Sequence, residues 1–212
     1  AAGRLIDGEK LPPEREMAAE LGIAVGTLRK ALAELHNRGL LDRIQGSGNY
    51  VRAVSDPKSL YAMFRLELIA GGGLPTAEIL SVDRLPKPPQ LPEFGRAEQA
   101  HRIRRLRRLN GLPAAIEEIW LDGSYVGVLD RDSLSESLYL FYRSKLSLWI
   151  VRAEDQVGLD HVPDWTPQAF GRPAGSPVPH VLRVSQDQNG ERAEVSRTWF
   201  DHTVARYVAR LK

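Results

Sequence analysis

Residues 10–51 read KLPPEREMAAELGIAVGTLRKALAELHNRGLLDRIQGSGNYV and contain two apolar groups, each at the spacing of an amphipathic helix. The first group follows Pro12 and Pro13, and proline's fixed φ suits a helix start, so we expect a helix from near Pro13. Gly22 interrupts the pattern, and the second group predicts a helix that ends near Gly39. The two groups are Met17, Ala18 and Leu21, then Leu28, Ala31, Leu32 and Leu35. Two short helices joined by a turn form a helix-turn-helix, although an ordinary helical hairpin has the same pattern.

The residues after the second helix predict a two-stranded hairpin. Residues 40–44 form the first expected strand, residues 45–48 (QGSG) a tight turn, and residues 49–51 the returning strand. Glycines at such a turn let the main chain approach phosphates or the minor groove of DNA closely. We therefore interpret the hairpin as the wing of a winged helix-turn-helix.

Length and composition indicate the class of protein and its number of domains. With 212 residues, 42% hydrophobic and 26% charged, the chain has the balance of a globular protein of two modest domains. It contains no cysteine, and it shows neither an apolar run of about 18 residues nor a signal segment, so we expect a soluble cytoplasmic protein. A net charge of +2 permits nucleic-acid binding without demonstrating it. We expect a DNA-binding domain over residues 1–54, a linker and first segment over 55–75, and a second domain over 76–212.

A basic strand is the most informative feature of the second domain. Residues 101–109 (HRIRRLRRL) precede Asn110-Gly111, a strong signal for a tight hairpin. Because alternate residues of a strand point to opposite faces, Arg105 and Arg107 share a face with apolar residues. Arginines on such a face need an anionic or hydrogen-bonding partner. The pattern leaves three interpretations open: a ligand pocket, a second nucleic-acid surface, or a solvated face paired with Glu117 or Glu118.

Residues 10–51 resemble the GntR-type regulators nearly throughout. The resemblance implies that the second helix lies in the major groove of DNA and that the glycine turn forms the wing tip. The residues that it assigns to DNA binding are Arg15, Thr27, Arg29, Lys30, Gly46, Ser47 and Gly48.

Two features depart from the GntR pattern. The family usually has Ser-Arg just before Thr27, where the serine caps the helix and the arginine reads a guanine, whereas this chain has Ala24 and Val25. We therefore expect an operator that differs from the family's common sequence at that position. Such domains also normally open with another helix before the stretch equivalent to residues 3–6 (GRLI), and that helix is missing from this sequence.

Residues 76–210 are similar, more loosely, to the UTRA effector-binding domain of the HutC subfamily of GntR regulators. The similarity rests on RLRRLNGLPAAIEEIWL (105–121), SESLY (135–139) and ERAEVSRTWF (191–200). It implies an α+β protein in which a chorismate-lyase-like antiparallel sheet with helices follows the winged helix-turn-helix. The effector-binding residues that it implies are Arg105, Arg107, Glu117, Ser137, Tyr139 and Glu194. Some relatives that sense sugar phosphates have a tyrosine at the position of Phe200, so a sugar phosphate cannot simply be assumed as the effector.

These observations predict a homodimeric transcriptional repressor that binds a double-stranded DNA operator and responds to a small polar or anionic metabolite. The alternative is a chorismate-lyase-like enzyme that acts on a small carboxylate, with Glu117 or Glu194 as acid or base. We expect no catalytic residues, no cofactor, no metal site and no membrane contact. The four tryptophans are expected in the core.

Overall fold

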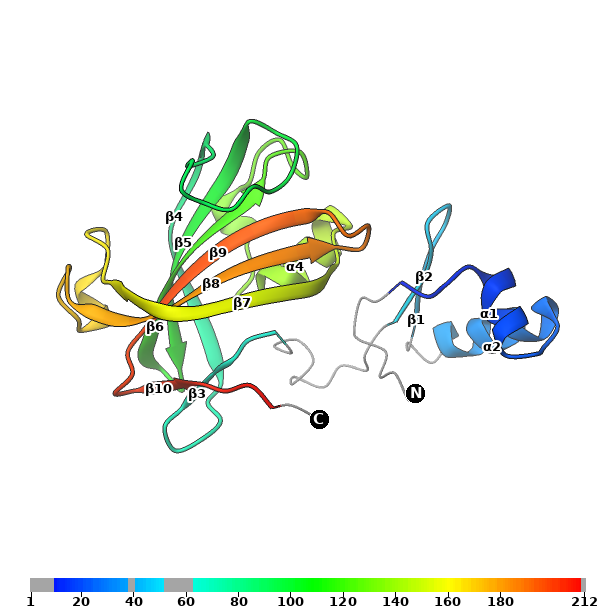
Figure 1. The fold of residues 1–212 in the computed structure, drawn as a ribbon, viewed down its shortest axis with the longest axis horizontal. Coiled ribbons are helices and arrows are strands. Elements are labelled where there is room, and N and C mark those ends of the chain that lie inside the picture. Colours follow the sequence, from blue (N-terminus) through cyan, green and yellow to red (C-terminus); the bar gives the residue numbers. More distant parts are fainter. Residues whose placement is uncertain (1–9, 38–40, 52–62, 211–212) are drawn as a thin grey trace. The chain divides into compact units, whose positions relative to one another are not determined.

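The computed structural model describes residues 10–37, 41–51 and 63–210 (Figure 1). The chain divides into two compact units, residues 1–61 and 62–212, and each is described by itself. Among the described residues, no helix is both long and apolar enough to cross a membrane.

The described part of the first unit has two helices followed by a hairpin. Helix α1 covers Glu14–Glu20 and helix α2 covers Val25–Asn37, while strands β1 (Leu41–Ile44) and β2 (Gly48–Val51) pair antiparallel. The core of this unit consists of Leu11, Ala18, Leu28, Leu32 and Leu41. The helix-turn-helix and the wing predicted from residues 10–51 are therefore confirmed. Residues 3–6, Gly39 and Leu40, which entered those predictions, lie outside the described residues.

The turn before α2 explains how the helix begins without a capping side chain. The carbonyl oxygen of Ala24 accepts the backbone N–H groups of Thr27 and Leu28 at 2.9 and 3.1 Å. Alanine has no side-chain oxygen to satisfy a further N–H of the first turn, a contribution that a serine at this place would add. The helix therefore depends on the packing of Leu28 and Leu32 against α1 and β1.

The second unit is built on one antiparallel sheet with strand order β4-β5-β6-β9-β8-β7 (Figure 1). Its strands are β4 (Pro75–Pro86), β5 (Gln99–Leu109), β6 (Leu112–Asp122), β7 (Ile150–His161), β8 (Pro177–Asp187) and β9 (Arg192–Phe200). Two short strands, β3 (Leu66–Leu68) and β10 (Ala205–Tyr207), pair with each other. The remaining elements are α4 (Leu138–Leu146) and the 3-10 turns η1 (Arg131–Ser133) and η2 (Gln168–Phe170). The predicted α+β class is confirmed.

The predicted hairpin after the basic strand is present. Strand β5 ends at Leu109 and β6 begins at Leu112, with Leu109 opposite Leu112. Asn110 and Gly111 between them have φ angles of 50° and 80°. Both residues thus adopt the left-handed backbone that a two-residue hairpin turn requires, and glycine and asparagine tolerate it best. The turn fixes the register in which β5 and β6 pair.

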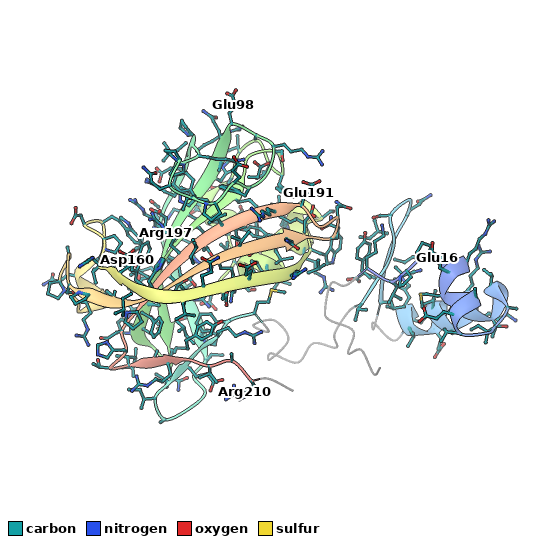
Figure 2. All side chains as sticks on the ribbon, in the orientation of Figure 1. Glu16, Glu98, Asp160, Glu191, Arg197 and Arg210 are labelled. Carbon is teal, nitrogen blue, oxygen red and sulfur yellow. The ribbon has the colours of Figure 1, made fainter. Side chains whose placement is uncertain are left out.

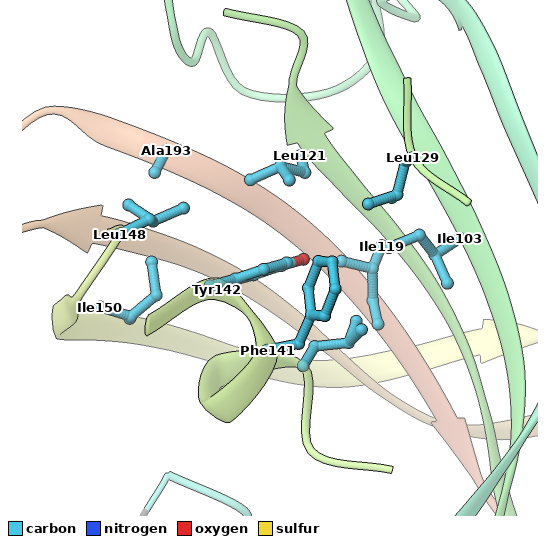
Figure 3. Close-up of a cluster of buried hydrophobic side chains, with 10 residues drawn as sticks. Ile103, Ile119, Leu121, Leu129, Phe141, Tyr142, Leu148, Ile150 and Ala193 are labelled. Atoms are coloured by element: carbon cyan, nitrogen blue, oxygen red, sulfur yellow. The ribbon is translucent and has the colours of Figure 1, made fainter. Parts of the chain in front are cut away.

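Helix α4 covers one face of the sheet, which we call the inner face. Phe141 and Tyr142 of α4 pack on Ile103 of β5 and on Ile119 and Leu121 of β6 (Figure 3). Tyr142, Ile103 and Leu121 are completely inaccessible to solvent. The helix therefore covers the sheet on the side to which Arg105 and Arg107 point.

The opposite, outer face carries the other arginines of β5. Leu106 packs with Val162, Phe170 and Trp199, as expected from the alternation of the strand. Trp120, Trp149 and Trp199 are buried and Trp165 is half-buried, in agreement with the expected core positions. Asp160 and Arg197, labelled in Figure 2, belong to this face, and the Asp160 carboxylate accepts the Trp199 Nε1–H at 3.0 Å.

Candidate effector site and DNA-binding surface

The first helix, the second helix and the wing expose the side chains that the sequence assigned to DNA binding. Arg15 on α1 and Thr27 and Lys30 on α2 are exposed. Gly46 and Gly48 of the wing turn have φ angles of 79° and 130°. Arginine, lysine and threonine side chains on such a surface are suited to phosphates and base edges.

Arg29 has an intramolecular partner that the sequence did not reveal. Its Nε lies 2.6 Å from Oε2 of Glu14, while Arg43 of β1 lies 3.3 Å from Oε1 of the same carboxylate. The hydrogen bond from Arg29 lowers the pKa of Glu14, so the carboxylate stays ionised at neutral pH. The ion pair joins α1, α2 and the wing strand, and it orients Arg29 while leaving it 62% exposed.

The centre of the inner face contains two buried arginines that share a carboxylate. Arg105 NH2 lies 2.6 Å from Glu117, and Arg107 Nε lies 3.8 Å from the same group. The side chains of Arg105, Arg107 and Glu117 are only 7%, 3% and 9% exposed. Burial alone would raise the pKa of Glu117, but the charges of the two arginines outweigh it and hold the pKa below its ordinary value.

Both arginines also bind the segment that leads into α4. The NH1 groups of Arg105 and Arg107 donate to the backbone carbonyl of Glu136 at 3.2 and 3.1 Å. The next residue, Ser137, is the N-cap of α4 and accepts the N–H of Leu140. Ser137 therefore stabilises the start of the helix beside the arginines.

A second carboxylate, Glu194 on β9, accepts hydrogen bonds from two tyrosines of α4. Tyr142 Oη donates to Oε2 at 2.8 Å, while Tyr139 Oη donates to Oε1 at 3.2 Å. The hydroxyl of Ser185 lies 2.9 Å from Tyr139 and donates to Glu194 at 3.3 Å. Burial raises the pKa of Glu194, and the tyrosine hydrogen bonds and the charge of Arg105 oppose the shift.

These contacts group the residues that the sequence assigned to an effector. Arg105, Arg107 and Glu117 are in direct contact, and Tyr139 contacts Glu194. Arg105 links the groups, because its charge acts on Glu194. Ser137 contributes by capping the helix that carries Tyr139.

Sequence reasoning missed Arg183 of β8, which also points to this site. The hydrogen bond between Arg183 and Tyr139 and its electrostatic interactions with Glu117 and Glu194 place it there. The alternation of residues along β8 places Arg183 on one face of that strand. The sequence gives no sign, however, that β8 pairs with β9 or that this face is the one that carries Arg105. Ser185 of β8 was missed for the same reason. Tyr142 was also missed; it lies on α4, three residues after Tyr139.

Comparison with known proteins finds matches for both units of the chain. The model of the bacterial regulatory proteins of the gntR family matches residues 1–51, and that of the UTRA domain matches residues 70–206. The HTH-type transcriptional regulator SmoD of Agrobacterium fabrum is 70% identical over 212 residues, which is 100% of this chain and 91% of that protein. The HTH-type transcriptional repressor NagR of Bacillus subtilis is 27% identical, over 99% of this chain and 89% of that protein.

A solved structure shares the fold. The crystal structure of the possible transcriptional regulator YydK from Bacillus subtilis superposes with a TM-score of 0.58 at 21% identity, covering 98% of this chain and 92% of that one.

A winged helix-turn-helix followed by an effector-binding domain defines a DNA-binding transcriptional regulator. This chain belongs to the GntR family, and its UTRA domain fits the architecture of the HutC subfamily. The family consists of regulators that bind DNA operators and, in the UTRA domain, small-molecule effectors. The chorismate-lyase-like enzyme considered as an alternative is thereby set aside, because the relatives are regulators.

Proposed function

We propose that this regulator is a homodimeric repressor of the bacterial cytoplasm whose operator affinity changes when a small anionic metabolite binds the inner face of the UTRA domain. One observation carries the effector assignment: Arg105 and Arg107 are buried side by side and donate to the same carbonyl oxygen. The Nε of Arg105 is buried without a hydrogen-bond partner among the described residues. An anionic ligand group would satisfy such donors better than a neutral carbonyl does.

The charges of the site favour a singly charged anion over a doubly charged one. Arg105, Arg107 and Arg183 carry three positive charges against the ionised carboxylates of Glu117 and Asp155. One positive charge is left, and Glu194 cancels it only when it is ionised, which its raised pKa disfavours. The hydroxyls of Tyr139 and Ser185 add partners for ligand hydroxyl groups.

Phe200 supports the same conclusion. Its ring is 5% exposed and packs with Leu109, Ala114 and Ala115. It therefore offers no hydroxyl donor where some relatives that sense sugar phosphates carry a tyrosine. A polyhydroxylated molecule with one carboxylate or phosphodiester fits the site better than a phosphomonoester.

On the DNA side, we propose that residues of α1, α2 and the wing contact the operator. They are the exposed Arg15, Thr27, Arg29, Lys30, Gly46 and Ser47 and the partly exposed Gly48. Two copies of the domain would read two half-sites of a pseudo-palindromic operator. The relative NagR is named a repressor, which supports the sign of regulation.

A thermal-shift screen of small anionic metabolites tests the effector assignment. The screen includes D-glucuronate, glucose 6-phosphate and D-glucose, which share a ring and differ in charge at carbon 6. We expect hits among singly charged anions, and we expect Arg105→Ala and Arg107→Lys to abolish them. Lysine keeps the charge of Arg107 but not its planar fork of donors.

Arg104→Ala is the matched control, since Arg104 pairs with Glu118 on the outer face at 2.8 Å as Arg105 pairs with Glu117 on the inner face. Hits that persist in both inner-face variants, or that disappear equally in Arg104→Ala, would contradict the assignment.

A further inference from the structure

Arg183 occupies the inner face, opposite residues of the two strands that flank β8. It lies opposite Ser196 of β9 and opposite Asp155 of β7. Its Nε and NH2 donate to the two oxygens of Asp155 at 2.5 and 2.6 Å, and its side chain is 16% exposed. The bidentate pair fixes the guanidinium, which also interacts with the hydroxyl of Tyr139.

Asp155 connects Arg183 to the C-terminal strand. The hydroxyl of Tyr207 donates to Oδ2 of Asp155 at 2.6 Å. Burial would raise the pKa of Asp155, but the hydrogen bonds from Arg183 and Tyr207 outweigh it and keep the carboxylate ionised. Tyr207 lies on β10, and its direct partner across the pair is Leu66 of β3.

A second contact joins the effector site to residues 63–68, the segment that contains strand β3. The ring of Phe64 lies with its centroid 4.4 Å from the guanidinium carbon of Arg107, a cation–π distance. Beside it, Val208 donates its N–H to the carbonyl of Arg65 at 2.7 Å, and Arg210 pairs with Glu67. Residues 63–68 thus contact both Arg107 and the Arg183–Asp155–Tyr207 chain. In sequence, they follow residues 52–62, which connect the wing to the UTRA domain.

We propose that Arg183 is the third anion-binding arginine of the effector site, and that Arg107 and Arg183 communicate anion binding to residues 63–68 through Phe64 and through Asp155–Tyr207. This inference rests on the proposed effector site.

The physical reason is competition for the same charges. An anion at Arg107 neutralises the charge that attracts the Phe64 ring, and an anion at Arg183 competes with Asp155 for its donors. Both contacts to residues 63–68 then weaken together. A ligand shifts a conformational equilibrium only by binding two states unequally, and these contacts supply such a difference.

The first experiment measures the binding of D-glucuronate, a singly charged anion, to the full chain by calorimetry, at an ionic strength held constant with chloride. We expect Arg183→Lys to weaken D-glucuronate binding at least fivefold, because lysine cannot hold Asp155 and an anion in one plane. Arg197→Lys is the control, since Arg197 pairs with Glu118 on the outer face at 2.5 Å.

The second experiment follows hydrogen exchange of the peptide covering residues 63–68, with and without D-glucuronate. We expect D-glucuronate to raise exchange there at least threefold in the unmodified chain. Tyr207→Phe and Phe64→Leu should still bind D-glucuronate within about threefold of the unmodified chain, but most of the increase in exchange should be lost. Tyr125→Phe is the control, because it removes a similar hydroxyl that donates to Asp187 at 3.0 Å.

The outcomes separate the two proposals. D-glucuronate that fails to bind the unmodified chain, or binds Arg105→Ala equally well, contradicts the effector site and this inference with it. D-glucuronate binding that depends on Arg105 but not on Arg183, or that leaves the exchange of residues 63–68 unchanged, overturns this inference alone.

Discussion

The guanidinium of Arg105 lies 2.6 Å from the carboxylate of Glu117, its direct neighbour across the β5–β6 pair, and both side chains are buried. The same strands repeat this arrangement one residue further on, where Arg104 pairs with Glu118 on the outer face at 2.8 Å. Glu118 is further bound by Arg197 and by the indole of Trp120. The inner carboxylate instead lies between the two buried arginines, Arg105 and Arg107, that are proposed to serve a ligand.

Glu117→Gln should lower the free energy of unfolding by about 3–5 kcal/mol, because it leaves two buried arginines without their shared negative charge. Urea denaturation of the purified protein measures the change. Glu191→Gln, which breaks the exposed pair with Arg96, should have little effect. A Glu117 variant as stable as the unmodified chain would show that the arginines do not need this carboxylate.

Anion binding should strengthen as the pH falls from neutral toward the ordinary range of a glutamate carboxyl. Burial raises the pKa of Glu194, and an anion nearby favours the protonated form further, so binding takes up a proton. The groups around Glu194 are Tyr139 and Tyr142 of α4, Ser185 and Arg183 of β8 and Arg105 of β5. Calorimetry at a series of pH values across this range measures the effect. Glu194→Gln should remove the pH dependence, and an equal dependence in that variant would assign it to another group.

Val25→Arg should change the sequence that the protein selects from a randomised operator library. Val25 is the first residue of α2, and an arginine there would restore a side chain able to form a bidentate contact with guanine, worth about 1–3 kcal/mol of discrimination. Leu35→Arg adds the same charge near the other end of α2 and should leave the consensus unchanged. Identical consensus sequences for Val25→Arg and the unmodified chain would exclude a role for this position in base readout.

Asp201 should contribute stability that is lost in acid. Burial alone would raise its pKa, but hydrogen bonds from Arg172 and Thr203 lower the pKa to about 2. A carboxyl whose pKa is lowered on folding stabilises the protein above its ordinary pKa, and this contribution disappears as the pH falls toward 2. The difference in unfolding free energy between the unmodified chain and Asp201→Asn should therefore shrink between pH 5 and pH 2. Asp164→Asn, at an exposed carboxylate, is the control; a constant difference for Asp201→Asn would contradict the shift.

Local patterns predicted the elements that depend on neighbours in sequence. The spacing of Leu28 and Leu32 indicated α2, and Asn110-Gly111 indicated the β5–β6 turn. Alternation along β5 placed Arg105 and Arg107 on one face. A two-residue turn also sets the register of β5 and β6. The pairing of the arginines with Glu117 was therefore among the alternatives that the sequence left open.

Contacts between distant segments were not predictable in the same way. Alternation places Arg183 on one face of β8, but it does not say that β8 pairs with β9 or that Asp155 of β7 lies opposite. The stacking of Phe64 on Arg107 depends on a segment 43 residues away in sequence. Likewise, the Glu14–Arg29 ion pair follows from how α1 crosses α2, which no spacing rule specifies.

The most direct test of the account is the affinity of the protein for a selected operator, measured by fluorescence anisotropy with and without the strongest anionic hit of the screen. We predict that the anion weakens operator binding by about 5–150-fold in the unmodified chain and in Arg104→Ala, and has no effect in Arg105→Ala. An anion that binds at the arginines yet leaves operator affinity unchanged would contradict the central claim that this site regulates DNA binding.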